Sequence, residues 1–166
     1  MFPYSLVIFD LDGTLVDSAP NIAEALNGTL RQLGLQQFSK PTIRSWIGEG
    51  VHALLATALR EAGSMRDADA AMPVMMKHYQ ASLLHNPQLY PGVAEALTGL
   101  RDAGVTLALC TNKPSRFIAP LLEYLGIAAH FSHVLGGDSL PQRKPDPAPL
   151  LQLAKHFQHS PQQCLM

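Results

Sequence analysis

The chain has 166 residues, of which 47% are hydrophobic and 15% charged, and its formal net charge is −1. This length suits one core domain with an insertion, the composition excludes a disordered chain, and the charge gives no basis for binding nucleic acid or an anionic membrane. No apolar run approaches the ~20 residues of a membrane span, and aspartates follow the short apolar start directly, so we expect a cytoplasmic protein without a signal peptide.

The first predicted element is a buried strand that ends in carboxylates. Residues 5–9 form an apolar run with β-branched and aromatic members, which is typical of a parallel strand buried on both faces. Polar residues and glycine take over in residues 10–14, which read Asp-Leu-Asp-Gly-Thr.

Residues 17–86 carry helical signals and no strand signal. Residues 17–20, Asp-Ser-Ala-Pro, predict a helix start with a capping side chain, and Gly34 is placed to end that helix. Further helices are predicted from Pro41, over residues 51–59 and over residues 65–84, the last with Pro73 inside.

Helices and strands alternate after the Tyr-Pro-Gly turn at residues 90–92. Predicted helices cover residues 93–103, 114–125 and 147–156, and predicted strands cover residues 105–110 and 131–135, with another strand beginning at 164. This order predicts an α/β core with a parallel sheet, made of residues 1–16 and 87–166. An all-helical cap domain of residues 17–86 interrupts that core.

Three polar clusters follow predicted strands, where ligands bind in open parallel sheets. Asp10 and Asp12 follow the first strand, residues 111–113, Thr-Asn-Lys, follow the second, and Lys144 comes shortly after the third. Because the carboxyl ends of parallel strands lie at one edge of a sheet, we expect these clusters to form one site.

A site of this composition suits phosphoryl transfer. Asp10 is the predicted nucleophile, and Asp12 is predicted to protonate the leaving oxygen and later to deprotonate water. Magnesium, the Thr111 hydroxyl and the Lys144 ammonium would remove the repulsion between a carboxylate and an anionic phosphate.

These residues resemble the motifs of the haloacid dehalogenase superfamily. Residues 10–14 look like its first motif, Thr111 like its second and Lys144 like its third. The similarity is greatest to bacterial phosphoglycolate phosphatases, through residues 46–50, 110–114, 136–138 and 143–149.

The resemblance implies a Rossmann-like, three-layer core with a helical cap, and Mg²⁺ as cofactor. It also implies hydrolysis of 2-phosphoglycolate to glycolate and phosphate through an aspartyl-phosphate. Asp10 would bind Mg²⁺ through its side chain and Asp12 through its backbone carbonyl. Dehalogenating members lack an acid at the position of Asp12, because a halide leaving group needs no proton.

The candidate substrate-binding residues are drawn from both parts of the chain. Arg44, in the predicted cap, could pair with a substrate carboxylate or simply lie on the surface. Asn112 and Lys113 could contact substrate or only start the next helix. Trp46 is expected in the core of the cap. The full set is Gly13, Thr14, Arg44, Asn112 and Lys113.

The fourth motif of the family, an acidic pair after the fourth strand, has no counterpart before Met166. Residues 137–139, Gly-Asp-Ser, resemble it superficially but follow the third strand, and we interpret them as a loop. We therefore expect a truncated form of a longer enzyme, weakly active or unstable alone, with the edge of the first strand exposed.

Other functions stay open on the sequence alone. A sugar-phosphate phosphatase or a phosphosugar mutase would share Asp10, Asp12 and the cap, and a non-catalytic remnant could bind a ligand or partner. We expect a small phosphate ester as the partner and a monomer or homodimer. Neither the two cysteines nor the histidine pairs have the further ligands that a zinc site needs.

Overall fold

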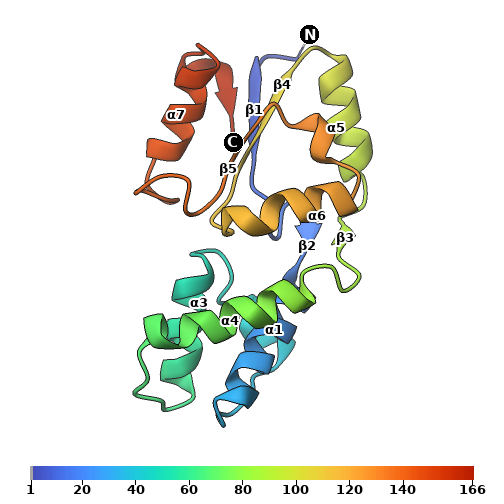
Figure 1. The fold of residues 1–166 in the computed structure, drawn as a ribbon. Helices are drawn as coiled ribbons and strands as arrows, with labels where there is room; N and C mark the ends of the chain where they lie inside the picture. The colour runs from blue at the N-terminus through green and yellow to red at the C-terminus, as the bar shows by residue number, and fades with distance from the viewer. Residues whose placement is uncertain (1) are drawn as a thin grey trace. The chain divides into compact units, whose positions relative to one another are not determined.

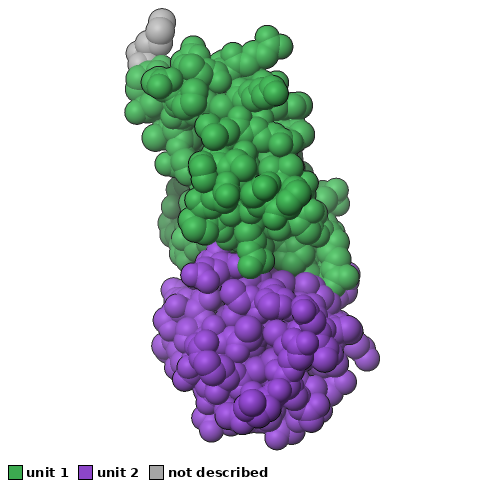
Figure 2. Space-filling view, turned by 90° about the vertical axis from the view of Figure 1, so that its left-hand side faces the viewer, with its two compact units in different colours: residues 1–16, 88–166 green, residues 17–87 purple. Residues whose placement is uncertain are grey.

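The computed structural model describes residues 2–166, which divide into two compact units (Figure 1). Unit 1 holds the residues up to Val16 together with Gln88–Met166, and unit 2 holds Asp17–Pro87. Figure 2 colours the two units separately. The domain boundaries predicted from the sequence fall after residues 16 and 86.

Unit 1 is built on a four-stranded parallel sheet with the order β5-β4-β1-β6. The strands are β1 (Leu6–Phe9), β4 (Thr106–Cys110), β5 (His133–Leu135) and β6 (Cys164–Leu165). Apolar runs without alternation predict strands covered on both faces, and the predicted parallel α/β core is confirmed.

Helices cover both faces of this sheet. Figure 1 shows α7 (Ala148–His156) on one side, and α5 (Val93–Asp102) and α6 (Ile118–Tyr124) on the other. Side chains alternate between the faces of a strand, so every second residue of β1 and β4 meets α7. One buried cluster accordingly joins Leu6, Ile8, Ala108 and Cys110 to Leu135 and to Leu153 of α7. Short 3₁₀ helices occupy Ser115–Phe117, Ala128–His130 and Pro161–Gln163.

The expectation that the first strand would be an exposed edge is wrong for its first residues. In β6, Cys164 pairs with Leu6 and Leu165 pairs with Val7, in parallel. Leu6 and Val7 are also buried. Even the two residues of β6 are enough to cover this part of β1.

Unit 2 consists of four helices around an apolar core. They are α1 (Ala19–Gln32), α2 (Lys40–Arg44), α3 (Val51–Glu61) and α4 (Ala68–Ser82). Leu26 and Leu30 of α1, Leu55 of α3 and Met75 of α4 are fully buried. None of the helices within residues 2–166 combines the length and apolar character that a membrane crossing requires.

Two local predictions at the entry to unit 2 need correction. Asp17 belongs to a short strand, β2 (Val16–Asp17), which forms a separate two-stranded sheet with β3 (Gln88–Leu89). The residue before α1 is therefore Ser18, whose side chain makes no capping hydrogen bond. Two-residue strands are too short to show any periodicity in sequence.

Candidate active site

The candidate catalytic residues of unit 1 lie where β1 and β4 end. Phe9 is paired with Leu109, so Asp10 and Thr111 leave neighbouring parallel strands at the same edge of the sheet. The Thr111 N–H donates to the carbonyl of Leu135, at the end of β5, over 3.0 Å. The carboxyl ends of three strands therefore meet at this edge, as the sequence predicts.

Asp10 forms an ion pair with Lys144. The Lys144 Nζ lies 2.9 Å from Asp10 Oδ1, and the Leu11 N–H donates to the same oxygen over 2.8 Å. The Asn112 side-chain amide donates to the backbone carbonyl of Lys144 over 2.9 Å, which ties the loop that carries Lys144 to the loop after β4. Asn112 thus positions Lys144 in the structure.

Asp12 has a cation of its own. The Lys113 Nζ lies 2.9 Å from Asp12 Oδ1, with 1% of the lysine side chain and 14% of the aspartate side chain exposed. A tight turn presents Asp12, because Gly13 adopts φ +81° and its N–H donates to the carbonyl of Val16 over 2.9 Å. Glycine adopts such a positive φ without steric cost.

Thr111 and Cys110 form the buried floor beside these pairs. Thr111 is 3% exposed, and its Oγ1 accepts the N–H of Lys113 over 3.2 Å. Burial raises the pKa of the Cys110 thiol, the Lys144 ammonium opposes this rise, and the Asp10 carboxylate adds to it. A buried thiol with a raised pKa stays protonated and is chemically inert.

The loop of residues 136–139 braces the segment that carries Lys113. The Gly137 N–H donates to the carbonyl of Lys113 over 2.8 Å, and the Asp138 carboxylate accepts the Ser115 N–H over 2.8 Å and the Ser115 hydroxyl. Partial burial acts to raise the pKa of Asp138, but the hydrogen bonds from Ser115 outweigh it and hold that pKa below its usual value. These residues form a loop, as interpreted from the sequence.

The other predicted substrate-binding residues lie outside the two ion pairs. Gly13 and Thr14 lie exposed in the turn after Asp12. Arg44 belongs to unit 2, where it forms an ion pair with Asp17. Trp46 makes an edge-to-face contact with Phe38, with ring centroids 5.0 Å apart.

Oxygen atoms of unit 1 fit the requirements of Mg²⁺. The Asp10 carboxylate and the Asp12 backbone carbonyl are hard oxygen donors, and magnesium completes its octahedron with water and substrate phosphate oxygens. In the described part of the chain, no three side chains of His, Cys, Asp or Glu gather as a metal cluster. The residues of this chain that would hold Mg²⁺ are Asp10 and Asp12, which flank Leu11 after β1.

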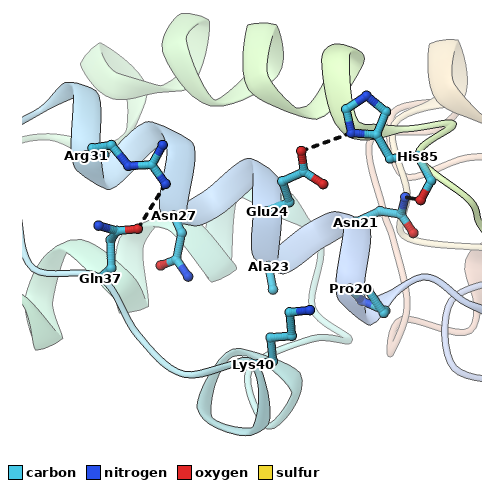
Figure 3. Close-up of a pocket in the computed structure, with 9 residues that line it drawn as sticks. All are labelled: Pro20, Asn21, Ala23, Glu24, Asn27, Arg31, Gln37, Lys40 and His85. Carbon is cyan, nitrogen blue, oxygen red and sulfur yellow. Dashed lines mark hydrogen bonds and ion pairs between the residues drawn. The ribbon is translucent and has the colours of Figure 1, made fainter.

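Unit 2 has a hollow of about 390 Å³ beside α1 (Figure 3). Much of its polar lining is already engaged within the unit. Arg31 donates to Gln37 over 3.1 Å, His85 and Glu24 pair at 2.9 Å, and the Asn21 amide donates to backbone carbonyls. Because these polar groups already pair with one another, the hollow is a weaker candidate for a functional site than the strand edge of unit 1.

A parallel α/β core with helices on both faces of its sheet, and with a helical unit inserted after its first strand, defines a doubly wound α/β protein with a helical insertion. The family model described as haloacid dehalogenase-like hydrolase matches residues 7–166. The chain belongs to this family.

Individual relatives agree with this assignment. A phosphoglycolate phosphatase of Pseudomonas fluorescens (strain Pf0-1) is 44% identical over 156 residues, which cover 90% of this chain and 57% of the relative. One of Colwellia psychrerythraea is 41% identical, covering 97% of this chain and 74% of the relative. A crystal structure of a predicted phosphoglycolate phosphatase from Haemophilus somnus matches with TM-score 0.91 and 36% identity, covering 99% of this chain and 76% of that one. The chain thus spans 57% to 76% of the length of these proteins.

Proposed function

We propose that this chain is a magnesium-dependent phosphomonoester hydrolase that forms an aspartyl-phosphate on Asp10 and acts on 2-phosphoglycolate. The observation that carries the proposal is the pair of separate ion pairs, Asp10 with Lys144 and Asp12 with Lys113, each at 2.9 Å. Two carboxyl groups in different surroundings suit two different roles, a nucleophile and a proton carrier.

The proposed reaction has two displacements at phosphorus. First, an Asp10 oxygen attacks phosphorus, the bond to the ester oxygen breaks, and that oxygen takes a proton from Asp12 and leaves as an alcohol. Next, Asp12 removes a proton from water, the water oxygen attacks phosphorus, and the bond to Asp10 breaks. Inorganic phosphate leaves, and Asp12 is again protonated.

The neighbouring residues supply charge and hydrogen bonds. Lys144, already paired with Asp10, offsets the negative charge of an incoming phosphate. Thr111 Oγ1 accepts the Lys113 N–H, and a hydroxyl has a proton of its own to donate to a phosphate oxygen. Mg²⁺, held by the Asp10 carboxylate and the Asp12 carbonyl, would supply the remaining charge neutralisation.

The choice of 2-phosphoglycolate as substrate is supported by the relatives. The curated relatives at 44% and 41% identity carry the name phosphoglycolate phosphatase. That substrate has a carboxylate besides its phosphate. Arg44 is proposed to bind it, because its guanidinium already pairs with the carboxylate of Asp17 and its side chain is 56% exposed.

The test is a phosphate-release assay over 2-phosphoglycolate, hexose phosphates and p-nitrophenyl phosphate, with Mg²⁺ or with EDTA. We expect release from 2-phosphoglycolate that EDTA abolishes and that Asp10→Asn lowers by at least about 10³-fold. Circular dichroism of the nearly isosteric Asp10→Asn variant controls for folding. Release from hexose phosphates alone would reassign the substrate, and a folded chain that hydrolyses no ester would contradict catalysis.

A further inference from the structure

Lys113 is a buried lysine whose ammonium group lies against Asp12. Its side chain is 1% exposed, and its Nζ is 2.9 Å from Asp12 Oδ1. Burying an ammonium without compensation is strongly unfavourable, and the ion pair with Asp12 helps to offset that cost. A lysine that served only to start the following helix would instead keep its ammonium group exposed to water.

The backbone of Lys113 is held on both sides. Its N–H donates to Thr111 Oγ1 over 3.2 Å, and its carbonyl accepts the Gly137 N–H over 2.8 Å. Asp138, next to Gly137, accepts hydrogen bonds from Ser115. The direction in which the Lys113 side chain leaves the backbone is therefore determined by the surrounding loops.

Close packing makes this support rigid. A Cβ atom placed on Gly137 would lie 2.4 Å from the backbone oxygen of Asn112. Only glycine allows the loop of residues 136–139 to lie so near the segment before Lys113. The loop of residues 136–139 therefore packs closely against the backbone that carries Lys113.

We infer that Lys113 is a positioning residue that holds the Asp12 carboxylate where it exchanges protons with the leaving oxygen and with water. The inference rests on the proposed function and assigns a role within it. Lys144 pairs with Asp10 and Lys113 with Asp12, so loss of Lys113 leaves the nucleophile with its own cation. Proton transfer requires heavy atoms within hydrogen-bond distance, and a displaced catalytic group slows it steeply.

The first test compares two leaving groups in the Lys113→Met variant, which keeps the side-chain length and removes the charge. An alkoxide must be protonated as it leaves, whereas p-nitrophenolate leaves without a proton. We expect kcat/KM to fall about 10²-fold for 2-phosphoglycolate and less than about fivefold for p-nitrophenyl phosphate. Lys155→Met, which changes an exposed lysine of α7, is the matched control and should leave both values unchanged. Equal losses on the two esters, or no loss on either, would overturn the inference.

The second test needs no activity. A double-mutant cycle combines Lys113→Met with Asp12→Asn and follows unfolding by denaturant. We expect the two changes to be non-additive by at least about tenfold in the unfolding equilibrium constant, and additive effects would overturn the pairing. If Lys113→Met does not fold, adding Asp12→Asn should restore folding, and failure to do so counts against the pair. If the wild-type chain hydrolyses no ester, the proposed function is contradicted. The double-mutant cycle would still decide whether Lys113 holds Asp12.

Discussion

The ion pairs of the two units differ in how far their cations are exposed to solvent. Among the residues that the structure describes, every ion pair of unit 2 joins side chains that are at least 35% exposed. In unit 1, the two pairs at the strand edge join side chains that are at most 34% exposed, and the Lys113 side chain is 1% exposed.

This difference in exposure favours the strand edge of unit 1 over the exposed pairs of unit 2 as a place to bind an anion. Exposed pairs contribute about 0–1 kcal/mol each, because water and salt screen them. Charges held away from water interact far more strongly with each other and with an incoming anion. The hollow beside α1 in unit 2 is therefore a weaker candidate for an anion-binding site than the strand edge of unit 1, where the buried Lys113 lies.

The largest effect is expected from Asp12→Asn in unit 1. The variant cannot donate or accept the proton, so turnover of 2-phosphoglycolate should fall by about 10²–10⁴-fold. Inhibition by inorganic phosphate should change little, because Asp10 and Lys144 are untouched. Steady-state kinetics with a phosphate inhibition series measures both, and unchanged turnover would remove Asp12 from its role.

Lys144→Met should have the next largest effect. The cation 2.9 Å from Asp10 disappears, so the phosphate meets an uncompensated carboxylate and kcat/KM should fall about 10²–10³-fold. Raising the Mg²⁺ concentration should recover part of the loss. A variant as active as the Lys155→Met control would show that the ion pair is not part of the site.

Gly137→Ala tests the loop that supports Lys113. The new Cβ would lie 2.4 Å from the Asn112 carbonyl oxygen, and relieving that overlap should lower the unfolding free energy by about 1–3 kcal/mol. Gly99→Ala, in helix α5 with nothing within 4 Å of its Cβ, is the control and should be neutral or stabilising. Urea unfolding measures both, and equal stability of the two variants would contradict the tight packing.

Arg44→Gln probes the exposed charges of unit 2. Its pair with Asp17 has side chains 56% and 35% exposed, so the unfolding free energy should change by less than about 1 kcal/mol. The KM for 2-phosphoglycolate should rise, while that for p-nitrophenyl phosphate, which has no carboxylate, should not. A parallel change in both KM values would remove Arg44 from carboxylate binding.

The smallest effect concerns His133 of β5. Burial lowers its pKa, and His156, whose ring centroid lies 4.3 Å away, lowers it further. The unfolded chain then binds the proton first, so stability falls as the pH drops through the ordinary histidine value of about 6.5 and levels off below the folded pKa. His133→Phe should flatten this part of the pH–stability curve, and an unchanged slope would exclude His133 as its source.

Sequence patterns predicted the elements that are long and strongly apolar. The strands around Ile8 and Leu109 are buried on both faces, and the residues after them stand at one edge because parallel strands share a direction. The pairing of β2 with β3 escaped prediction, since two-residue strands have no period.

Local patterns predicted that the polar clusters after the strands meet, but they could not predict which lysine pairs with which aspartate. Lys113 and Asp12 are 101 positions apart, and no local signal distinguishes a buried lysine from a solvated one. The support that Asp138 gives to Ser115 spans 23 positions and likewise depends on the tertiary fold.

The measurement that tests the central claim most directly is mass spectrometry of peptides from the chain, acid-quenched during turnover of 2-phosphoglycolate with Mg²⁺. We expect a phosphoryl group on Asp10 in the wild type and none in Asp10→Asn. Steady phosphate release without any phosphorylated Asp10, or with the phosphoryl group on another residue, would contradict it.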